Sequence, residues 1–149
     1  MGSPATGRQV VMSVHPRYAE GIMDGRKRVE FRKRPLACDV SVVWVYATAP
    51  VQRIVGCFEI DATITAPPRD LWRQFASVGG IDRADFDRYY AGSSVGSGIR
   101  IGNVVRLEVP MPLQELLPSG VPPQSFAYVE PVEPPNRQCV LAAPAGRPT

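Results

Sequence analysis

Cysteine and histidine are scarce in this chain of 149 residues, which contains three cysteines and one histidine. Cys38, Cys57 and Cys139 are widely spaced, and His15 has no second histidine nearby. A structural zinc site needs about four such ligands at short spacing, so we expect no metal site and no cofactor. The odd number of cysteines disfavours the disulfide scaffold of a secreted protein and favours a reduced, cytoplasmic location.

Long apolar segments and phosphate-binding loops are also lacking. No stretch of the sequence approaches the roughly 20 apolar residues that a membrane-spanning helix needs, and no signal pattern opens the chain, so we expect no membrane partner. The segment 96–98 (Gly-Ser-Gly) has neither the lysine nor the spacing of a P-loop. Cys38 and Cys57 have no assignable His or carboxylate partner, which disfavours a covalent nucleophile.

What the chain does have is a basic run over residues 26–34, where six of nine residues are Lys or Arg and one is Glu. The pattern alternates, which predicts a strand with one apolar face and one charged face. The apolar residues are Val29 and Phe31, and the charged ones are Arg28, Glu30 and Arg32. Such a strand fits one wall of a groove for an anionic partner, and equally an exposed edge strand that uses charge to prevent aggregation.

Hydrophobic periodicity predicts an α+β domain with about six strands and three short helices. The predicted strands are 9–14, 27–33, 40–47, 53–65, 99–109 and 125–130. The predicted helices are 16–24, 69–77 and 83–90. We expect the strands to form a small, partly open β-barrel. The folded domain spans 9–130 in this prediction, and the small, polar or Pro/Ala-rich ends, 1–8 and 131–149, are predicted to be disordered.

Several short motifs in order resemble one known family, the ASCH domain. They are Val14–Ala19, Gly25–Arg32, Val45–Pro50, Ile54–Glu59, Ile101–Asn103 and Pro122–Phe126. The resemblance covers residues 10–130. It implies a β-barrel similar to the PUA domain of RNA-modifying enzymes, and it implies binding of RNA or nucleotides.

Some members of this family are amidohydrolases that act on N4-acetylcytidine, and others are described as ribonucleases. The amidohydrolases place a catalytic Lys after the first helix, a Thr three residues later and a Glu in the helical insertion. Lys27 occupies the Lys position, but Glu30 stands where the Thr would be, and the loop 78–80 has no carboxylate. The carboxylates Asp82 and Asp85 are better explained as residues of a helix start. The resemblance therefore carries over only one of three catalytic roles.

The candidate site centres on Lys27, Glu30 and Arg32. Glu30 and Arg32 lie two residues apart on one strand and so share a face, where Arg32 fits a phosphate or carbonyl and Glu30 a base amino group. The alternative is an exposed ion pair worth about 0–1 kcal/mol. Further candidates for ligand binding are Ser13, His15, Arg28, Arg34, Tyr46, Thr48, Gln124 and Ser125. For Tyr46, stacking on a base competes with plain core packing.

The sequence leads to three hypotheses of function. The first is a single-domain module that binds nucleic acid or nucleotide through a basic groove, with RNA preferred and DNA as a further possibility. The second is a hydrolase of a modified nucleoside or of RNA, in which Lys27 and Glu30 are catalytic and Lys27 is the base, which requires a pKa lowered towards 7. The third is a protein-interaction domain. The oligomeric state stays open.

Overall fold

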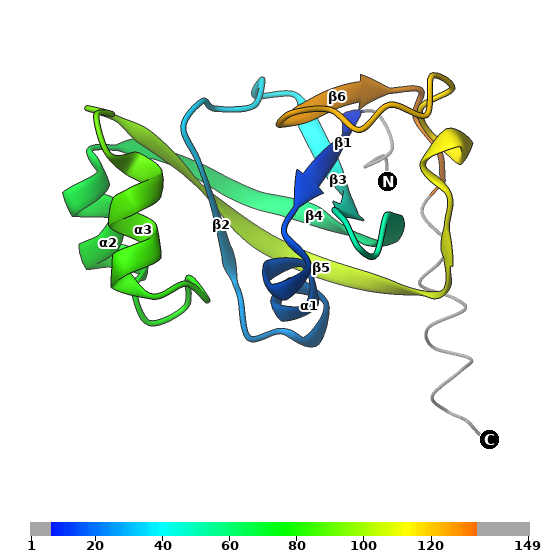
Figure 1. The fold of residues 1–149 in the computed structure, drawn as a ribbon. Helices are drawn as coiled ribbons and strands as arrows, with labels where there is room; N and C mark the ends of the chain where they lie inside the picture. The colour runs from blue at the N-terminus through cyan, green and yellow to red at the C-terminus, as the bar shows by residue number, and fades with distance from the viewer. Residues whose placement is uncertain (1–6, 134–149) are drawn as a thin grey trace.

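The computed structural model describes residues 7–133. The disorder predicted for 1–8 and 131–149 lies almost entirely outside that range. The described residues form a mixed α+β domain whose elements follow one another in the predicted order, with one six-stranded sheet and three helices (Figure 1). No helix in this part of the chain is long and apolar enough to span a membrane.

The six strands form a sheet in the order β2-β5-β4-β3-β1-β6. The strands are β1 (Arg8–Val14), β2 (Val29–Arg32), β3 (Val40–Ala47), β4 (Arg53–Ala66), β5 (Gly96–Met111) and β6 (Phe126–Val129). All pairings are antiparallel except that of β1 with β3. The ladder shifts register around Gly56, where the sequence predicts a bulge that bends the long strand.

The three helices are α1 (Pro16–Asp24), α2 (Pro68–Phe75) and α3 (Arg83–Tyr90), and a short 3-10 turn, η2, covers Leu113–Glu115. Proline at the start suits α1, because its missing N–H would have no helical partner there. Gly25 ends α1 in the left-handed conformation, with φ of 87°. The Asp82 carboxylate caps α3 by accepting from the Asp85 N–H, as the sequence predicts.

The predicted barrel is not closed by backbone pairing. Among the described residues, β2 and β6 are the outer strands of the sheet and do not pair with each other. β2 has only four residues, and Figure 1 shows it crossing in front of the long β4–β5 pair, apart from β1 and β6. The site described below lies at this interruption, where side chains rather than ladder hydrogen bonds connect the two edges.

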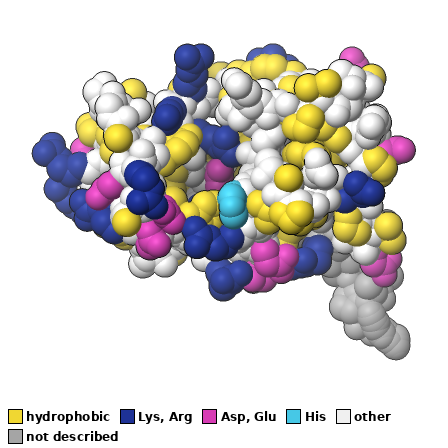
Figure 2. Space-filling model, viewed as in Figure 1, with side chains coloured by type: hydrophobic (Ala, Val, Ile, Leu, Met, Phe, Trp, Pro, Cys, Tyr) yellow, Lys and Arg dark blue, Asp and Glu magenta, His cyan; other side chains and the backbone are white. Residues whose placement is uncertain are grey.

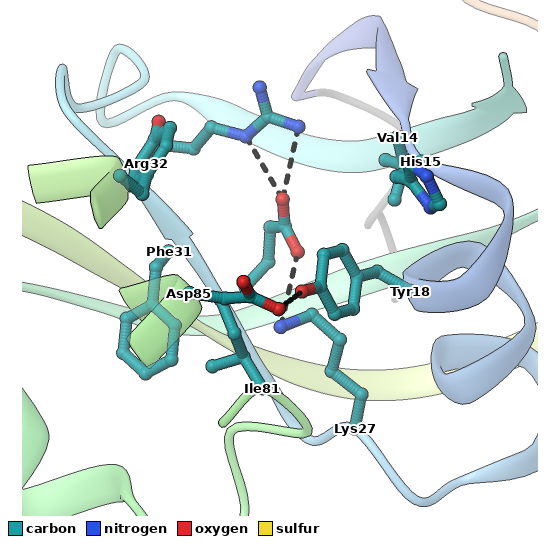
Figure 3. A pocket seen from close by; sticks show the side chains of 10 residues that line it. Val14, His15, Tyr18, Lys27, Phe31, Arg32, Ile81 and Asp85 are labelled. Atoms are coloured by element: carbon teal, nitrogen blue, oxygen red, sulfur yellow. Dashed lines mark hydrogen bonds and ion pairs between the residues drawn. The ribbon is translucent and has the colours of Figure 1, made fainter. Parts of the chain in front are cut away.

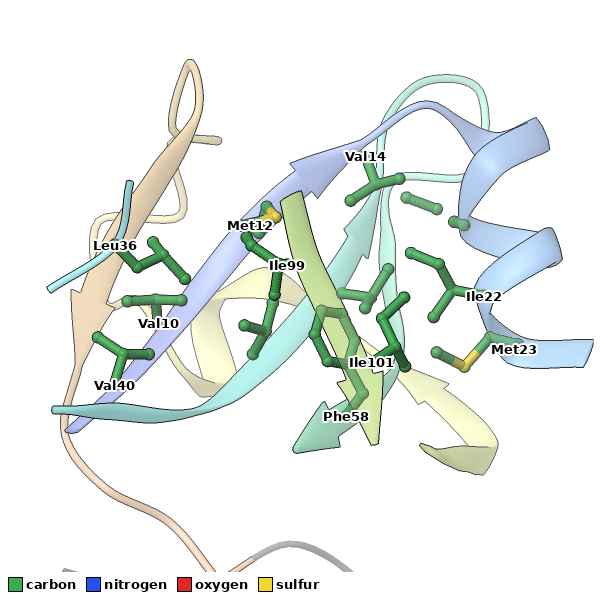
Figure 4. Packing of buried hydrophobic residues seen from close by; sticks show 14 residues of the cluster. Val10, Met12, Val14, Ile22, Met23, Leu36, Val40, Phe58, Ile99 and Ile101 are labelled. Carbon is green, nitrogen blue, oxygen red and sulfur yellow. The ribbon is translucent and has the colours of Figure 1, made fainter. Parts of the chain in front are cut away.

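The main hydrophobic core fills the space between α1 and the concave side of the sheet. Ile22 and Met23 of α1 pack against β1, β4 and β5 through residues such as Met12, Phe58 and Ile99 (Figure 4). Val10, Val43 and Val45 of the same cluster are fully buried. This packing fixes the position of α1, and therefore that of Lys27, three residues after its end.

A separate cluster joins α2 and α3 to β2. The two helices lie side by side at one end of the β4–β5 pair (Figure 1), and Phe75 and Phe86 pack against Val29 and Phe31 of β2. The predicted alternation of β2 is therefore confirmed, because its apolar residues face the helices. Glu30 must then point the other way, towards α1 and the interruption in the sheet.

Candidate functional site

Lys27, Glu30 and Arg32 form a continuous chain of buried charges (Figure 3). The Lys27 Nζ lies 3.5 Å from Glu30 Oε1, and Glu30 Oε2 accepts from Arg32 Nε at 3.0 Å. The side chains of the three residues are 3%, 8% and 12% exposed. The alternative of a solvent-exposed ion pair therefore does not apply. Burying charges costs free energy that the pairing only partly restores, so this chain contributes little stability as such.

The Lys27 side chain reaches Glu30 by passing close to two glycines, where any larger side chain would be in the way. A Cβ on Gly80 would lie 2.6 Å from the Lys27 Cβ, and one on Gly21 would lie 3.3 Å from it. Gly80 also has φ of 62°, a conformation that other residues rarely adopt. The Gly79 carbonyl accepts from the Lys27 Nζ at 2.6 Å. The loop before α3 thus holds both the stem and the ammonium group of Lys27.

Burial lowers the pKa of Lys27 from its ordinary value. The Glu30 carboxylate opposes that change, and the Arg32 guanidinium adds to it. The rings of Tyr18 and Phe31 lie 5.2 Å and 5.3 Å from the Lys27 Nζ, close enough for their faces to stabilise the cation. The Lys27 ammonium group is therefore held in place by its partners, but its charged form is less favourable here than in water.

Arg32 connects β2 to the opposite edge of the sheet. Its Nη2 donates to the Ser13 carbonyl at 2.8 Å, and its Nη1 donates to the Ser125 Oγ at 3.3 Å. The Ser13 N–H donates to the Ser125 carbonyl, and the Ser13 hydroxyl donates to the Pro123 carbonyl. Ser13, Arg32 and Ser125, which the sequence proposes as site residues, are therefore brought together.

The buried charges lie at the bottom of a pocket of about 200 Å³, which we call the Lys27 pocket. Its walls come from β1, α1, β2, the loop before α3 and α3 itself. The aromatic and apolar side chains that line it are Val14, His15, Tyr18, Phe31, Ile81 and Tyr89. Aromatic walls above a bottom of hydrogen-bonding groups suit a flat, polar-edged ring such as a nucleobase.

One further carboxylate lines this pocket, that of Asp85. The Tyr18 hydroxyl donates to Asp85 Oδ2 at 3.1 Å, and Arg17 donates to the same atom at 2.9 Å. Burial alone would raise the pKa of Asp85, but the hydrogen bonds from Tyr18 and Arg17, together with the charges of Arg88 and Arg17, outweigh it, and the pKa lies below its ordinary value. Burial raises the pKa of the Tyr18 hydroxyl. Asp85 is therefore an ionised acceptor, and its hydrogen bonds hold Tyr18 in place in the pocket wall.

His15 stands at the rim of the Lys27 pocket. Figure 2 shows it at the centre of this face, with Lys and Arg side chains on one side of it and carboxylates among them. Its Nδ1 accepts from the Arg17 N–H at 3.2 Å and so caps α1. That bond uses one ring nitrogen and leaves Nε2 as the donor of the neutral ring.

The other predicted site residues do not line this pocket. Tyr46 is 4% exposed and packs in the cluster that includes Trp44, so the structure gives its ring a packing role. The Thr48 N–H donates to the Val14 carbonyl beside the site. Arg28, Arg34 and Gln124 are exposed.

Sequence reasoning missed Tyr18, Ile81, Asp85 and Tyr89. Their spacing is that of ordinary helix packing and capping, and only the fold brings them to Lys27. The Gly79-Gly80 pair is the signal that was available, since adjacent glycines in a short loop suggest a close approach by another group. Among residues 7–133, no three His, Cys, Asp or Glu side chains are placed to hold a metal ion.

The fold and the site together define a single α+β domain whose interrupted sheet carries a charged pocket with aromatic walls. The chain belongs to the ASCH domain family, whose model matches residues 12–110. It is 27% identical over 125 residues to an ASCH domain-containing ribonuclease of Zymomonas mobilis. The aligned residues make up 82% of this chain and 84% of that protein. The family assignment made from the sequence motifs is confirmed.

Solved structures agree with this assignment. The crystal structure of ASCH from Zymomonas mobilis superimposes with a TM-score of 0.76 at 25% identity, covering 82% of this chain and 87% of that one. A point variant of the same protein gives a TM-score of 0.75 and covers 90% of its chain. A large ribosomal subunit protein uL22 of Ureaplasma parvum is 25% identical over 127 residues, which is 84% of this chain and 40% of that protein.

Proposed function

We propose that this domain binds RNA and takes one nucleotide of a single strand into the Lys27 pocket. The observation that carries the proposal is the buried chain Lys27–Glu30–Arg32 beneath aromatic walls. A nucleobase offers two faces for Tyr18 and Tyr89 and polar edge atoms for the charged groups. Membership of the ASCH family and the similarity to a ribonuclease support RNA as the polymer. The cytoplasmic location expected from the few cysteines is part of this proposal.

Charge on the surface supports the same partner. Arg17, Arg26 and Arg88, which neighbour residues of the pocket, have exposed guanidinium groups that each pair with an aspartate, and the net charge of the chain is +3. Phosphates of a bound strand would exchange their counterions for these groups, so the affinity should fall as salt rises. DNA would meet the same charges, and discrimination in favour of RNA would have to come from contacts to the 2′-hydroxyl.

The test is binding of a labelled single-stranded RNA, the matching DNA and an RNA duplex, each at two salt concentrations. We expect the single-stranded RNA to bind best, with an affinity that falls with salt, and Lys27→Met to weaken binding by about tenfold or more. Arg8→Gln is the matched control, because Arg8 is exposed and paired with Asp39 far from the pocket along β1. Equal affinities of Lys27→Met and the wild type would contradict the proposal.

A second candidate function is cleavage of the bound RNA or of a modified nucleoside, with Lys27 as base. The specific observation in its favour is that burial lowers the Lys27 pKa, since only a neutral amine can accept a proton. The nearby Glu30 works against it by stabilising the ammonium form. Incubation of RNA with the wild type and with Lys27→Met separates the two functions: cleavage that requires Lys27 supports catalysis, and binding without cleavage supports the module.

A further inference from the structure

A second pocket adjoins the Lys27 pocket along α1. It has a volume of about 190 Å³ and shares Tyr18, Lys27 and Ile81 with the Lys27 pocket. The residues that line only the second pocket are Arg17, Gly21, Arg26, Gly80 and Asp82. We call it the Arg26 pocket. Residues of α1 and of the loop before α3 line both pockets, so the two pockets adjoin along these elements.

The two pockets differ in chemistry. The Lys27 pocket has aromatic walls, whereas the Arg26 pocket is lined by two exposed arginines and by Lys27. Its one carboxylate, Asp82, already accepts from the Asp85 N–H as the cap of α3. Each lining cation also pairs with a carboxylate, Arg17 with Asp85, Arg26 with Asp24 and Lys27 with Glu30, so the charges around the pocket largely balance. An anionic ligand is favoured where such a pair leaves N–H donors unused.

Arg26 is positioned to bind such a ligand. Asp24 holds it from one side, accepting from its backbone N–H at 3.0 Å and from its Nε at 2.7 Å. Within residues 7–133, the terminal nitrogens of Arg26 have no hydrogen-bond partner. A guanidinium offers five N–H donors in a planar fork that fits phosphate oxygens in pairs. The salt bridge to Asp24 thus orients the group without using its terminal donors.

We propose that the Arg26 pocket binds the phosphate next to the nucleoside held in the Lys27 pocket. This inference rests on the proposed function, because it needs a nucleoside in the Lys27 pocket. The phosphate of a nucleotide is one covalent linkage from its sugar, so it can reach a pocket that adjoins that of the base. Arg26, just after the end of α1, provides the main contact, and Arg17, which also binds Asp85 and Tyr18, provides charge from the first turn of that helix.

The test compares ligands with and without the phosphate. Calorimetric titrations would use the four ribonucleosides and their 5′- and 3′-monophosphates, with the wild type, Arg26→Gln and Arg8→Gln. In the wild type we expect the phosphate to raise the affinity by about tenfold, as for a charge-assisted hydrogen bond. Arg26→Gln should lose this gain while binding the nucleoside as well as the wild type does. Arg8→Gln, which makes the same charge change beside Asp39, should keep the gain.

Each outcome decides the matter. A gain with either monophosphate that disappears in Arg26→Gln alone supports the Arg26 pocket, and the preferred isomer gives the direction of the strand. A gain that persists in Arg26→Gln, or that falls equally in Arg8→Gln, overturns it while leaving the proposed function intact. A wild type that binds no nucleoside and no nucleotide overturns both.

Discussion

At the scale of single residues, Lys27 is the feature that most distinguishes this domain from a simple folding unit. Its side chain is almost entirely buried, yet its environment gives it one carboxylate, one carbonyl and two aromatic faces. A methionine would fill a similar space without burying an ammonium group, and would leave Glu30 paired with Arg32 alone. The ammonium group therefore lies where its burial is unfavourable for folding, as is common for charged groups at functional sites.

The lowered pKa of Lys27 predicts how stability depends on pH. Between the pKa of Lys27 in the folded protein and its ordinary value of 10.5, the unfolded chain binds more protons than the folded one. The free energy of unfolding contributed by Lys27 therefore rises with pH in that range, by at most about 1.4 kcal/mol per pH unit. Lys27→Met lacks this contribution and keeps the other titratable groups, the tyrosines included.

Urea unfolding of the wild type and Lys27→Met from pH 7 to pH 10 measures this effect. The difference in unfolding free energy, wild type minus variant, should increase as pH rises. A difference that stays constant or decreases over this range would show that burial does not lower the pKa of Lys27.

At the scale of elements, the loop between α2 and α3 determines whether Lys27 reaches the site. Gly80→Ala should destabilise the protein and weaken RNA binding, because alanine disfavours the positive φ of this position and its Cβ would overlap the Lys27 stem. Gly92→Ala is the matched control: its φ is 82°, but nothing lies within 4 Å of the added Cβ. It should cost only about 1–2 kcal/mol of backbone strain.

Chemical unfolding and RNA titration of both variants test the role of this loop. Gly80→Ala should lose more stability than Gly92→Ala, and only Gly80→Ala should lose affinity for RNA. Similar losses in the two variants would mean that backbone strain alone matters and that the close approach of Gly80 does not position Lys27.

The elements themselves could largely be predicted from the sequence, because local signals define them. α1 begins at Pro16 and ends before Gly25 as expected, and the alternation of β2 orients Glu30 correctly. β2 is shorter than predicted, since Lys27 and Arg28 belong to the turn that follows α1. The pocket walls from α3 could not be predicted, because Asp85 and Tyr89 reach Lys27 only through the packing of Phe86 on Phe31.

At the scale of the whole molecule, Arg32 takes the place of backbone pairing between the two edges of the sheet. Arg32→Lys keeps the charge but cannot donate to Glu30, Ser13 and Ser125 at once. We expect amide exchange in β2 and at Ser13 to become about tenfold faster. Arg100→Lys on the neighbouring strand β5 is the control, because the Arg100 side chain is exposed and, within residues 7–133, its ion pair is with Asp61.

Hydrogen exchange followed by mass spectrometry compares these two variants with the wild type. Faster exchange confined to Arg32→Lys and to the two sheet edges is the expected result. Unchanged exchange in Arg32→Lys would mean that the interrupted sheet is held together by its hydrophobic clusters without this side chain.

The most direct test of RNA binding in the Lys27 pocket uses His15, the single histidine of the chain, which lines that pocket. Its ring protons give one resolved set of NMR signals without any labelling. During titration with a short single-stranded RNA, these signals should shift and saturate at the RNA concentration that saturates binding measured by anisotropy. His15 signals that stay unchanged while RNA binds would place the RNA elsewhere on the molecule and contradict the account.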